Sequence, residues 1–158
     1  MIRVQRPPFD VGAELAALTA GRTDIGAVVT FAGLVRDMAD ERAIVAMTLE
    51  HYPGMTEKKL AEIETEARRR WPLQASLIIH RYGRMLPGEP IVLVATASPH
   101  RAAALEACAF LIDWLKTKAP FWKLEETGDG SQWVDARDAD RQAAARWERP
   151  GGDRQDRQ

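Results

Sequence analysis

Hydrophobic residues along the chain fall into stretches with helical spacing and stretches with the spacing of strands. Helical spacing, with capping and stop residues, predicts helices between Asp10 and Gly21 and over residues 56–71, 100–118 and 138–147. Apolar runs rich in β-branched residues predict strands over residues 25–31, 44–50, 76–82, 91–97, 121–126 and 132–134. Turn signals between neighbouring strands favour antiparallel pairing, so the pattern predicts an α+β fold.

The predicted helix over residues 100–118 is the most apolar of the four. Its buried stripe is predicted to consist of Leu105, Cys108, Leu111, Ile112 and Leu115. Cys108 is the single cysteine of the chain and lies inside this stripe. A thiol in apolar surroundings has a raised pKa and forms little thiolate, so a core residue is favoured over a nucleophile. A single cysteine also excludes an intrachain disulfide.

Length and composition narrow the class of protein. The chain has 158 residues, 46% of them hydrophobic and 28% charged, which is typical of one globular domain, predicted over residues 1–149. Residues 150–158 are polar and are expected to be a disordered tail. No signal peptide or membrane-length apolar run is recognisable, which favours a cytoplasmic location and no membrane partner.

Several kinds of chemistry have no support in the sequence. A net charge of −1 argues against nucleic acid as a partner. Glycine-rich phosphate loops are missing, and the three histidines and one cysteine do not have the spacing of metal ligands. We therefore predict neither a metal nor another cofactor.

Lysines cluster where the third long helix ends and a strand begins. At 100° per residue Lys116 lies about 20° from Leu105 on the helix, at the edge of the predicted buried stripe. A lysine half-desolvated in this way has a lowered pKa and can act as a base or nucleophile. The alternative is that lysines near a helix C-terminus interact with its dipole and coat the surface, which is the interpretation favoured for Lys118.

Further cationic residues indicate an anionic ligand. Arg36 lies in a polar loop predicted to begin at Gly33, and His100 and Arg101 open a helix whose free N–H groups attract anions. Arg101 and Lys116 are separated by about 22 Å along a straight helix, so both cannot readily contact one small molecule. Either they serve separate sites or the helix start of a second subunit completes the pocket. We favour the second, which predicts a homodimer with composite sites.

Residues 9–147 contain, in this order, the segments FAGLVRD, LEHYPGMTEKKLAEIETEARRRWPL, IIHRYG, SPHRAAALEACAFLIDWLKTKAPFWKLE and WVDA. These segments, and their order, resemble the large, catalytic subunit of molybdopterin synthase. The stretches HYPGMTEK and LKTKAPFWK are long and unusual, so the match is far more specific than a short motif.

The resemblance implies a fold, partners and a reaction. The fold is an α/β hammerhead type with a mainly antiparallel sheet and flanking helices. A central homodimer would bind a small ubiquitin-like subunit at each end, giving a heterotetramer. That subunit carries sulfur as a thiocarboxylate on its C-terminal Gly-Gly. Two sulfur transfers to cyclic pyranopterin monophosphate would open the cyclic phosphate and form the dithiolene of molybdopterin.

Site residues follow from the same resemblance. Lys116 is expected to be the principal catalytic group, as general acid/base or as transient covalent acceptor of the partner's C-terminus. Lys123 would orient the thiocarboxylate and stabilise negative charge. The expected substrate-binding residues are Leu34, Val35, Arg36, His100, Arg101, Lys116, Lys123, Leu124, Glu125 and Arg137.

Two departures from the family bear on these assignments. Leu124 stands where many members have a basic residue, so a charged role there is lost. The loop DMADERA after Arg36 lacks the glycine and asparagines of some relatives. Two other functions remain open: a non-catalytic module that binds a ubiquitin-like protein, and a general phosphate-ester enzyme. The second gives no reason for the apolar segment APFW.

Overall fold

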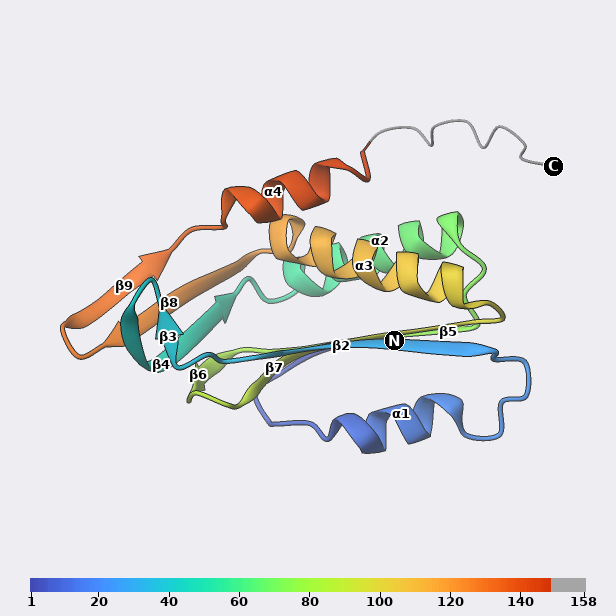
Figure 1. Cartoon of the computed structure of the whole chain (residues 1–158), viewed down its shortest axis with the longest axis horizontal. Helices are drawn as coiled ribbons and strands as arrows, with labels where there is room; N and C mark the ends of the chain where they lie inside the picture. The colour runs from blue at the N-terminus through green and yellow to red at the C-terminus, as the bar shows by residue number, and fades with distance from the viewer. Residues whose placement is uncertain (149–158) are drawn as a thin grey trace.

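A four-stranded sheet lies between one helix and a pair of helices in the computed structural model, which describes residues 1–148 (Figure 1). The strand order is β1 (Ile2–Gln5), β5 (Ala75–Arg81), β7 (Pro90–Ser98) and β2 (Ala27–Leu34). β1 runs parallel to β5, and the other neighbours are antiparallel. This confirms the α+β prediction. The tail predicted over residues 150–158 lies outside the described residues.

The two central strands of this sheet are covered on both faces. Ile78 and Val94 pack with the helices α2 (Met55–Arg70) and α3 (Arg101–Lys118). On the other face, Leu77, Ile79, Leu93 and Ala95 pack with residues of α1 (Val11–Thr19). Burial of both faces explains why β5 and β7 have nearly continuous apolar sequences instead of alternating ones.

A second sheet is built around the long strand β4 (Arg42–His51), at the left of Figure 1. β4 pairs with β3 (Met38–Ala39), β6 (Gly83–Met85) and β8 (Phe121–Thr127), and β8 also pairs with β9 (Gly130–Val134). A small core covers this sheet, consisting of Val35, Ala39, Ile44, Met47, Leu49 and Met85. The last helix, α4 (Asp138–Ala145), packs on α3.

The helices agree with the sequence pattern to within a few residues, and their ends show why. The Asp10 carboxylate caps α1 by accepting a hydrogen bond from the Ala13 N–H at 2.7 Å. The Gly54 N–H donates to Glu57 at the start of α2. α3 ends just before Pro120, which turns the chain into β8. None of the described helices is long and apolar enough to cross a membrane.

One predicted core position is wrong. Leu105 is 54% exposed, whereas the neighbouring Ala104 is fully buried. Small residues at Ala104 and Ala107 let α3 approach the sheet closely, and the Thr96 hydroxyl donates to the Ala104 carbonyl at 2.7 Å. The face of α3 that meets the sheet is therefore rotated away from Leu105. Cys108 is 4% exposed, as predicted.

The loop expected to begin at Gly33 starts later. β2 continues through Gly33 to Leu34, and β3 lies inside the segment predicted to be loop. A Cβ atom at Gly33 would come within 2.7 Å of the Val92 side chain, so the glycine permits close packing of the two strands rather than a bend.

The β3–β4 hairpin turns at two residues with positive φ, Asp40 at 47° and Glu41 at 65°. Such a two-residue turn favours Asn-Gly or Asp-Gly, and glutamate is strained there. We expect Glu41→Gly to stabilise the protein by about 0.5–1 kcal/mol, measured by urea unfolding. Ala43→Gly, in the adjacent strand where φ is not positive, should destabilise it. Destabilisation by Glu41→Gly would contradict the strain assigned to this turn.

Candidate functional site

A cavity of about 580 Å³ opens between the second sheet and the C-terminal end of α3. Its walls come from the end of β2 and the loop after it, from β4 and β8, and from the start of α4. Charged side chains from several of these regions line it: Arg36, Lys116, Lys123, Glu125, Asp135, Arg137 and Asp140. The volume is within the range of small-molecule sites.

The turn from α3 into β8 places two lysines on the same cavity. Lys116 lies in the last turn of α3, and Pro120 ends the helix, so that β8 begins only three residues beyond Lys118 and leads away from the helix end. Side chains alternate along β8, so Phe121, Lys123 and Glu125 face the cavity and Leu124 lies on the opposite face. Lys116 and Lys123 thus line the same cavity.

Lys123 has a nearby carboxylate. Its Nζ lies 3.3 Å from Glu125 Oε1, and the Glu125 side chain is only 9% exposed. The two residues are two positions apart on β8, so both point into the cavity. Glu125 can therefore hold the Lys123 ammonium in a fixed direction, as a buried carboxylate requires a charged partner.

Lys116 is less buried than the sequence suggested. Its side chain is 50% exposed, and its Nζ lies 3.9 Å from Asp140 Oδ1. Leu105, from which the apolar edge was inferred, is itself exposed, whereas Ile112 of the same predicted stripe is partly buried and lines the cavity with Lys116. Desolvation does not distinguish Lys116 from a surface lysine; its place on the cavity wall does.

Two guanidinium groups complete the cationic lining. Arg36 and Arg137 both line the cavity, and within residues 1–148 neither has a carboxylate within 4 Å. The two lysines are paired with Glu125 and Asp140, so the two arginines outnumber Asp135, the remaining acid of the lining. Guanidinium groups bind phosphate or carboxylate oxygens well. The cavity is therefore suited to an anion.

Other predicted residues fall into two groups. Leu34 and Val35 line the cavity, the former exposed and the latter buried. His100 precedes α3 and Arg101 begins it, at the opposite end from Lys116, and neither lines the cavity. Leu124 does not line it either. A single chain therefore brings together seven of the ten predicted residues, and the composite site with His100 and Arg101 stays a prediction.

Sequence reasoning missed a histidine at the cavity wall. His80 on β5 is buried, lines the cavity and stacks on Phe121 with ring centroids 3.7 Å apart. Its Nδ1 lies 2.9 Å from the Arg81 carbonyl oxygen, which can only accept, so Nδ1 carries the proton. Burial lowers the pKa of His80 to about 4, so the ring is neutral near pH 7. The apolar run around His80 gave no sign of this position.

We expect His80 to make stability fall as the pH drops from about 6.5 to 4. In this window the unfolded chain binds a proton that the folded protein does not, so acid favours unfolding. Through His80 alone, the free energy of unfolding should be about 3 kcal/mol lower below pH 4 than at pH 7. Urea unfolding at pH 7, 5.5 and 4 should show it in the wild type and in His100→Gln, but not in His80→Gln. Equal pH dependence in all three would contradict this role.

Cys108 lies in the core rather than at the cavity. Its sulfur is 4.0 Å from the Val94 carbonyl oxygen, and burial raises the pKa of the thiol to about 11. A thiol with so little thiolate is a poor nucleophile. Any sulfur handled at this site must therefore come from another molecule.

Comparison with known proteins gives a consistent result. A family model described as "MoaE protein" matches residues 4–118. The chain is 57% identical over 148 residues to a molybdopterin synthase catalytic subunit of Mesorhizobium japonicum, covering 92% of each protein. A MoaE protein structure from Burkholderia ambifaria is 53% identical, covers 95% of this chain and 99% of its own, and gives a TM-score of 0.81.

A more distant solved structure has the same fold. The molybdopterin synthase structure from Staphylococcus aureus is 33% identical, with a TM-score of 0.78, over 84% of this chain and 96% of its own. Both solved structures are therefore similar to this chain over more than four-fifths of its length.

Proposed function

The chain belongs to the MoaE family, and on that premise we propose that it is the catalytic subunit of a molybdopterin synthase. Its cavity would bind cyclic pyranopterin monophosphate and admit the thiocarboxylated C-terminus of a small ubiquitin-like subunit. The observation that supports this most directly is that Lys116 and Lys123 line one cavity beside two arginines that have no carboxylate within 4 Å among residues 1–148. Both reactants are anions, and this lining is suited to anions.

The substrate and the tail require different contacts. Arg36 and Arg137 can donate bidentate hydrogen bonds to the phosphate of the substrate. Lys123, held by Glu125 at 3.3 Å, would bind the thiocarboxylate and stabilise the charge that develops as it reacts. The apolar walls from Val35, Met47 and Phe121 exclude water from one side of the reacting groups.

Each transfer forms one carbon–sulfur bond to the substrate in place of a carbon–oxygen bond, whose oxygen leaves with the opened phosphate or as water. Each transfer also breaks the bond between sulfur and the carbonyl carbon of the tail. Water attacks that carbonyl carbon and converts the tail to a carboxylate, or the Lys116 amine first accepts the acyl group and water releases it later. In either route Lys116 must exchange a proton or an acyl group at the reacting atoms. Its position on the cavity wall permits both routes.

His100 and Arg101 would contribute to the cavity of a neighbouring copy of the chain. They open α3 at the end far from Lys116, so within one chain they cannot reach the same small molecule. In a homodimer the start of α3 from one subunit can complete the cavity of the other. We propose this arrangement, with one small subunit on each copy.

The decisive experiment mixes the purified protein with thiocarboxylated small subunit and cyclic pyranopterin monophosphate. Dithiolene product, followed by mass spectrometry, should depend on all three components. A stable complex without product, with a partner and substrate active with another synthase, would instead indicate a docking module. Binding of simple phosphate esters at comparable affinity would indicate a general phosphate-ester enzyme.

A further inference from the structure

Helix α4 brings a carboxylate to the principal lysine of the cavity. Asp140 lies in the first turn of α4, lines the cavity, and has its Oδ1 3.9 Å from Lys116 Nζ. Its side chain is 29% exposed, compared with 50% for Lys116. A distance of 3.9 Å is at the outer limit of an ion pair, so the pair itself does not hold α4 in place.

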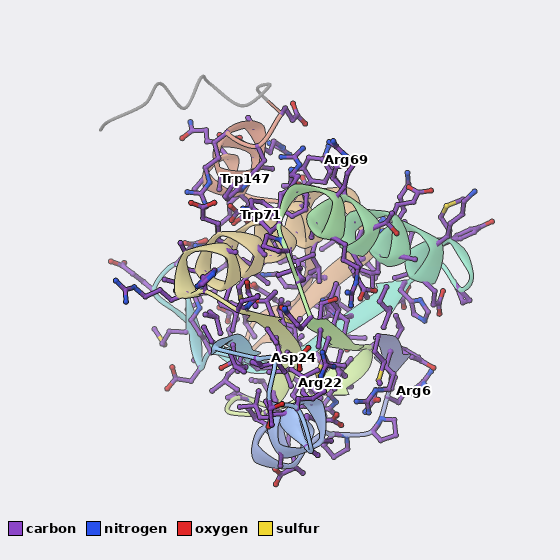
Figure 2. The ribbon with its side chains drawn as sticks, turned by 90° about the vertical axis from the view of Figure 1, so that its right-hand side faces the viewer. Arg6, Arg22, Asp24, Arg69, Trp71 and Trp147 are labelled. Carbon is purple, nitrogen blue, oxygen red and sulfur yellow. The ribbon has the colours of Figure 1, made fainter. Side chains whose placement is uncertain are left out.

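Other contacts hold α4, and the residues just after it, against α3 next to Lys116. The Trp114 indole N–H donates to the Ala144 carbonyl at 3.4 Å. Asp113 accepts hydrogen bonds from Arg146 and from the Trp147 indole, both at 2.7 Å. The Trp147 ring also meets Trp71 edge-on, with centroids 5.7 Å apart, and Figure 2 shows the two residues one above the other. Packing therefore determines where Asp140 sits relative to Lys116.

Apart from Asp135, the other charged groups around Lys116 are paired or cationic. On its own helix, Asp113 already binds Arg146 and Trp147. On β8, Glu125 is paired with Lys123. Arg36, Arg137 and Asp135 also line the cavity, and the neighbouring His80 is neutral. In the part of the chain that the structure describes, Asp140 is the carboxylate that lies within 4 Å of Lys116.

We propose that Asp140 is a positioning residue for Lys116, acting as the counterion that directs its ammonium along the cavity wall until an anionic substrate takes its place. The proposal rests on the catalytic role proposed for Lys116. A carboxylate in this position has two opposed effects. It keeps the flexible lysine in one orientation, which favours the chemical step. It also repels an anionic substrate, which weakens substrate binding.

These opposed effects give a signature that a purely structural residue would not produce. Asp140→Asn keeps the size of the side chain and removes its charge. Turnover should therefore fall by about 10-fold or more, because Lys116 is no longer directed. The affinity for cyclic pyranopterin monophosphate should rise by about 3-fold, because a repelling charge is gone. Asp140→Glu should recover most of the turnover.

The chain offers a matched control in the same helical turn. Asp138 is 89% exposed, pairs with Arg141 at 2.9 Å, and does not line the cavity. Removing either acid weakens the interaction with the N-terminus of α4 to a similar extent. Asp138→Asn and Asp140→Asn should therefore unfold at similar temperatures, while only the second changes turnover and substrate affinity.

A second readout does not depend on activity. The rate at which an amine-reactive reagent labels Lys116, relative to Lys118 in the same protein, can be measured by mass spectrometry. The Asp140 carboxylate lies against the Lys116 amine and restricts the approach of a reagent, so labelling of Lys116 should be faster in Asp140→Asn than in the wild type or Asp138→Asn.

The outcomes separate this proposal from the proposed function. If wild type forms product but Asp140→Asn matches Asp138→Asn in turnover, substrate affinity and Lys116 labelling, Asp140 does not position the lysine. Loss of turnover and substrate affinity together, with a lower unfolding temperature, would also overturn the proposal. Wild type that forms no product would instead refute the proposed function, and the labelling rates would still test the ion pair.

Discussion

Lys116→Ala should reduce dithiolene formation by at least about 100-fold while leaving the small subunit bound. Lys116 is on the cavity wall, and its side chain is half exposed with one long ion pair to Asp140. Removing it therefore costs little stability but takes away the group that must exchange a proton or acyl group with the reactants. Single-turnover product formation by mass spectrometry and partner binding by calorimetry would measure the two effects separately.

Lys118→Ala is the matched control for this variant. Lys118 lies two residues further along the same helix, pairs with Glu148 at 3.1 Å and covers the Trp114 ring. It does not line the cavity. Turnover close to wild type is expected. If Lys116→Ala turned over as fast as Lys118→Ala, the catalytic assignment of Lys116 would be wrong.

Gly26→Ala should cause a large loss of stability, about 3 kcal/mol or more. A Cβ atom at this position would lie 2.0 Å from the Pro99 carbonyl oxygen and 3.0 Å from its carbon. Both are backbone atoms, so no side-chain rotation relieves the overlap. The Gly26 N–H also donates to the Ser98 carbonyl at 3.0 Å, which ties the two segments together. Urea unfolding with a fixed m-value would measure the change.

Gly128→Ala provides the comparison for an unhindered glycine. Gly128 lies between β8 and β9, its φ is not positive, and a Cβ atom added there would meet nothing within 4 Å. Its substitution should change stability by less than about 1 kcal/mol. If the two variants lowered the free energy of unfolding equally, the Pro99 backbone would be able to shift to make room for a Cβ atom at Gly26. The close contact would then not hold the segment before α3 in place.

Long periodic segments could be predicted from the sequence, and short ones could not. α2 shows this well, because Leu60, Ile63 and Ala67 are buried at the spacing that predicted the helix. β1, β3 and β6 have only four, two and three residues, so none has enough alternation to be recognised. The pairing of these short strands depends on the tertiary fold. For example, β6 is a strand because it pairs with β4.

The site could be predicted only in part, for a similar reason. Lys116 and Lys123 are only seven residues apart, on either side of the short connection from α3 to β8, so local sequence brings them to the same cavity. Asp140 and His80 reach the cavity through the packing of α4 on α3 and of β5 beneath Phe121. Leu105 was misplaced because periodicity identifies an apolar face but not how far small residues rotate it.

The alternation of side chains along strand β8 restricts how many residues can lie between Pro120 and Lys123. Phe121, Lys123 and Glu125 point to the cavity, while Trp122 points the other way and is 49% exposed. Because the side-chain period of a strand is two, one added or deleted residue between Pro120 and Lys123 would exchange the two faces. An indole would then enter the cavity and the ammonium would leave it. Outward positions can vary in residue type, as Leu124 does, but the residue count between helix and lysine is fixed.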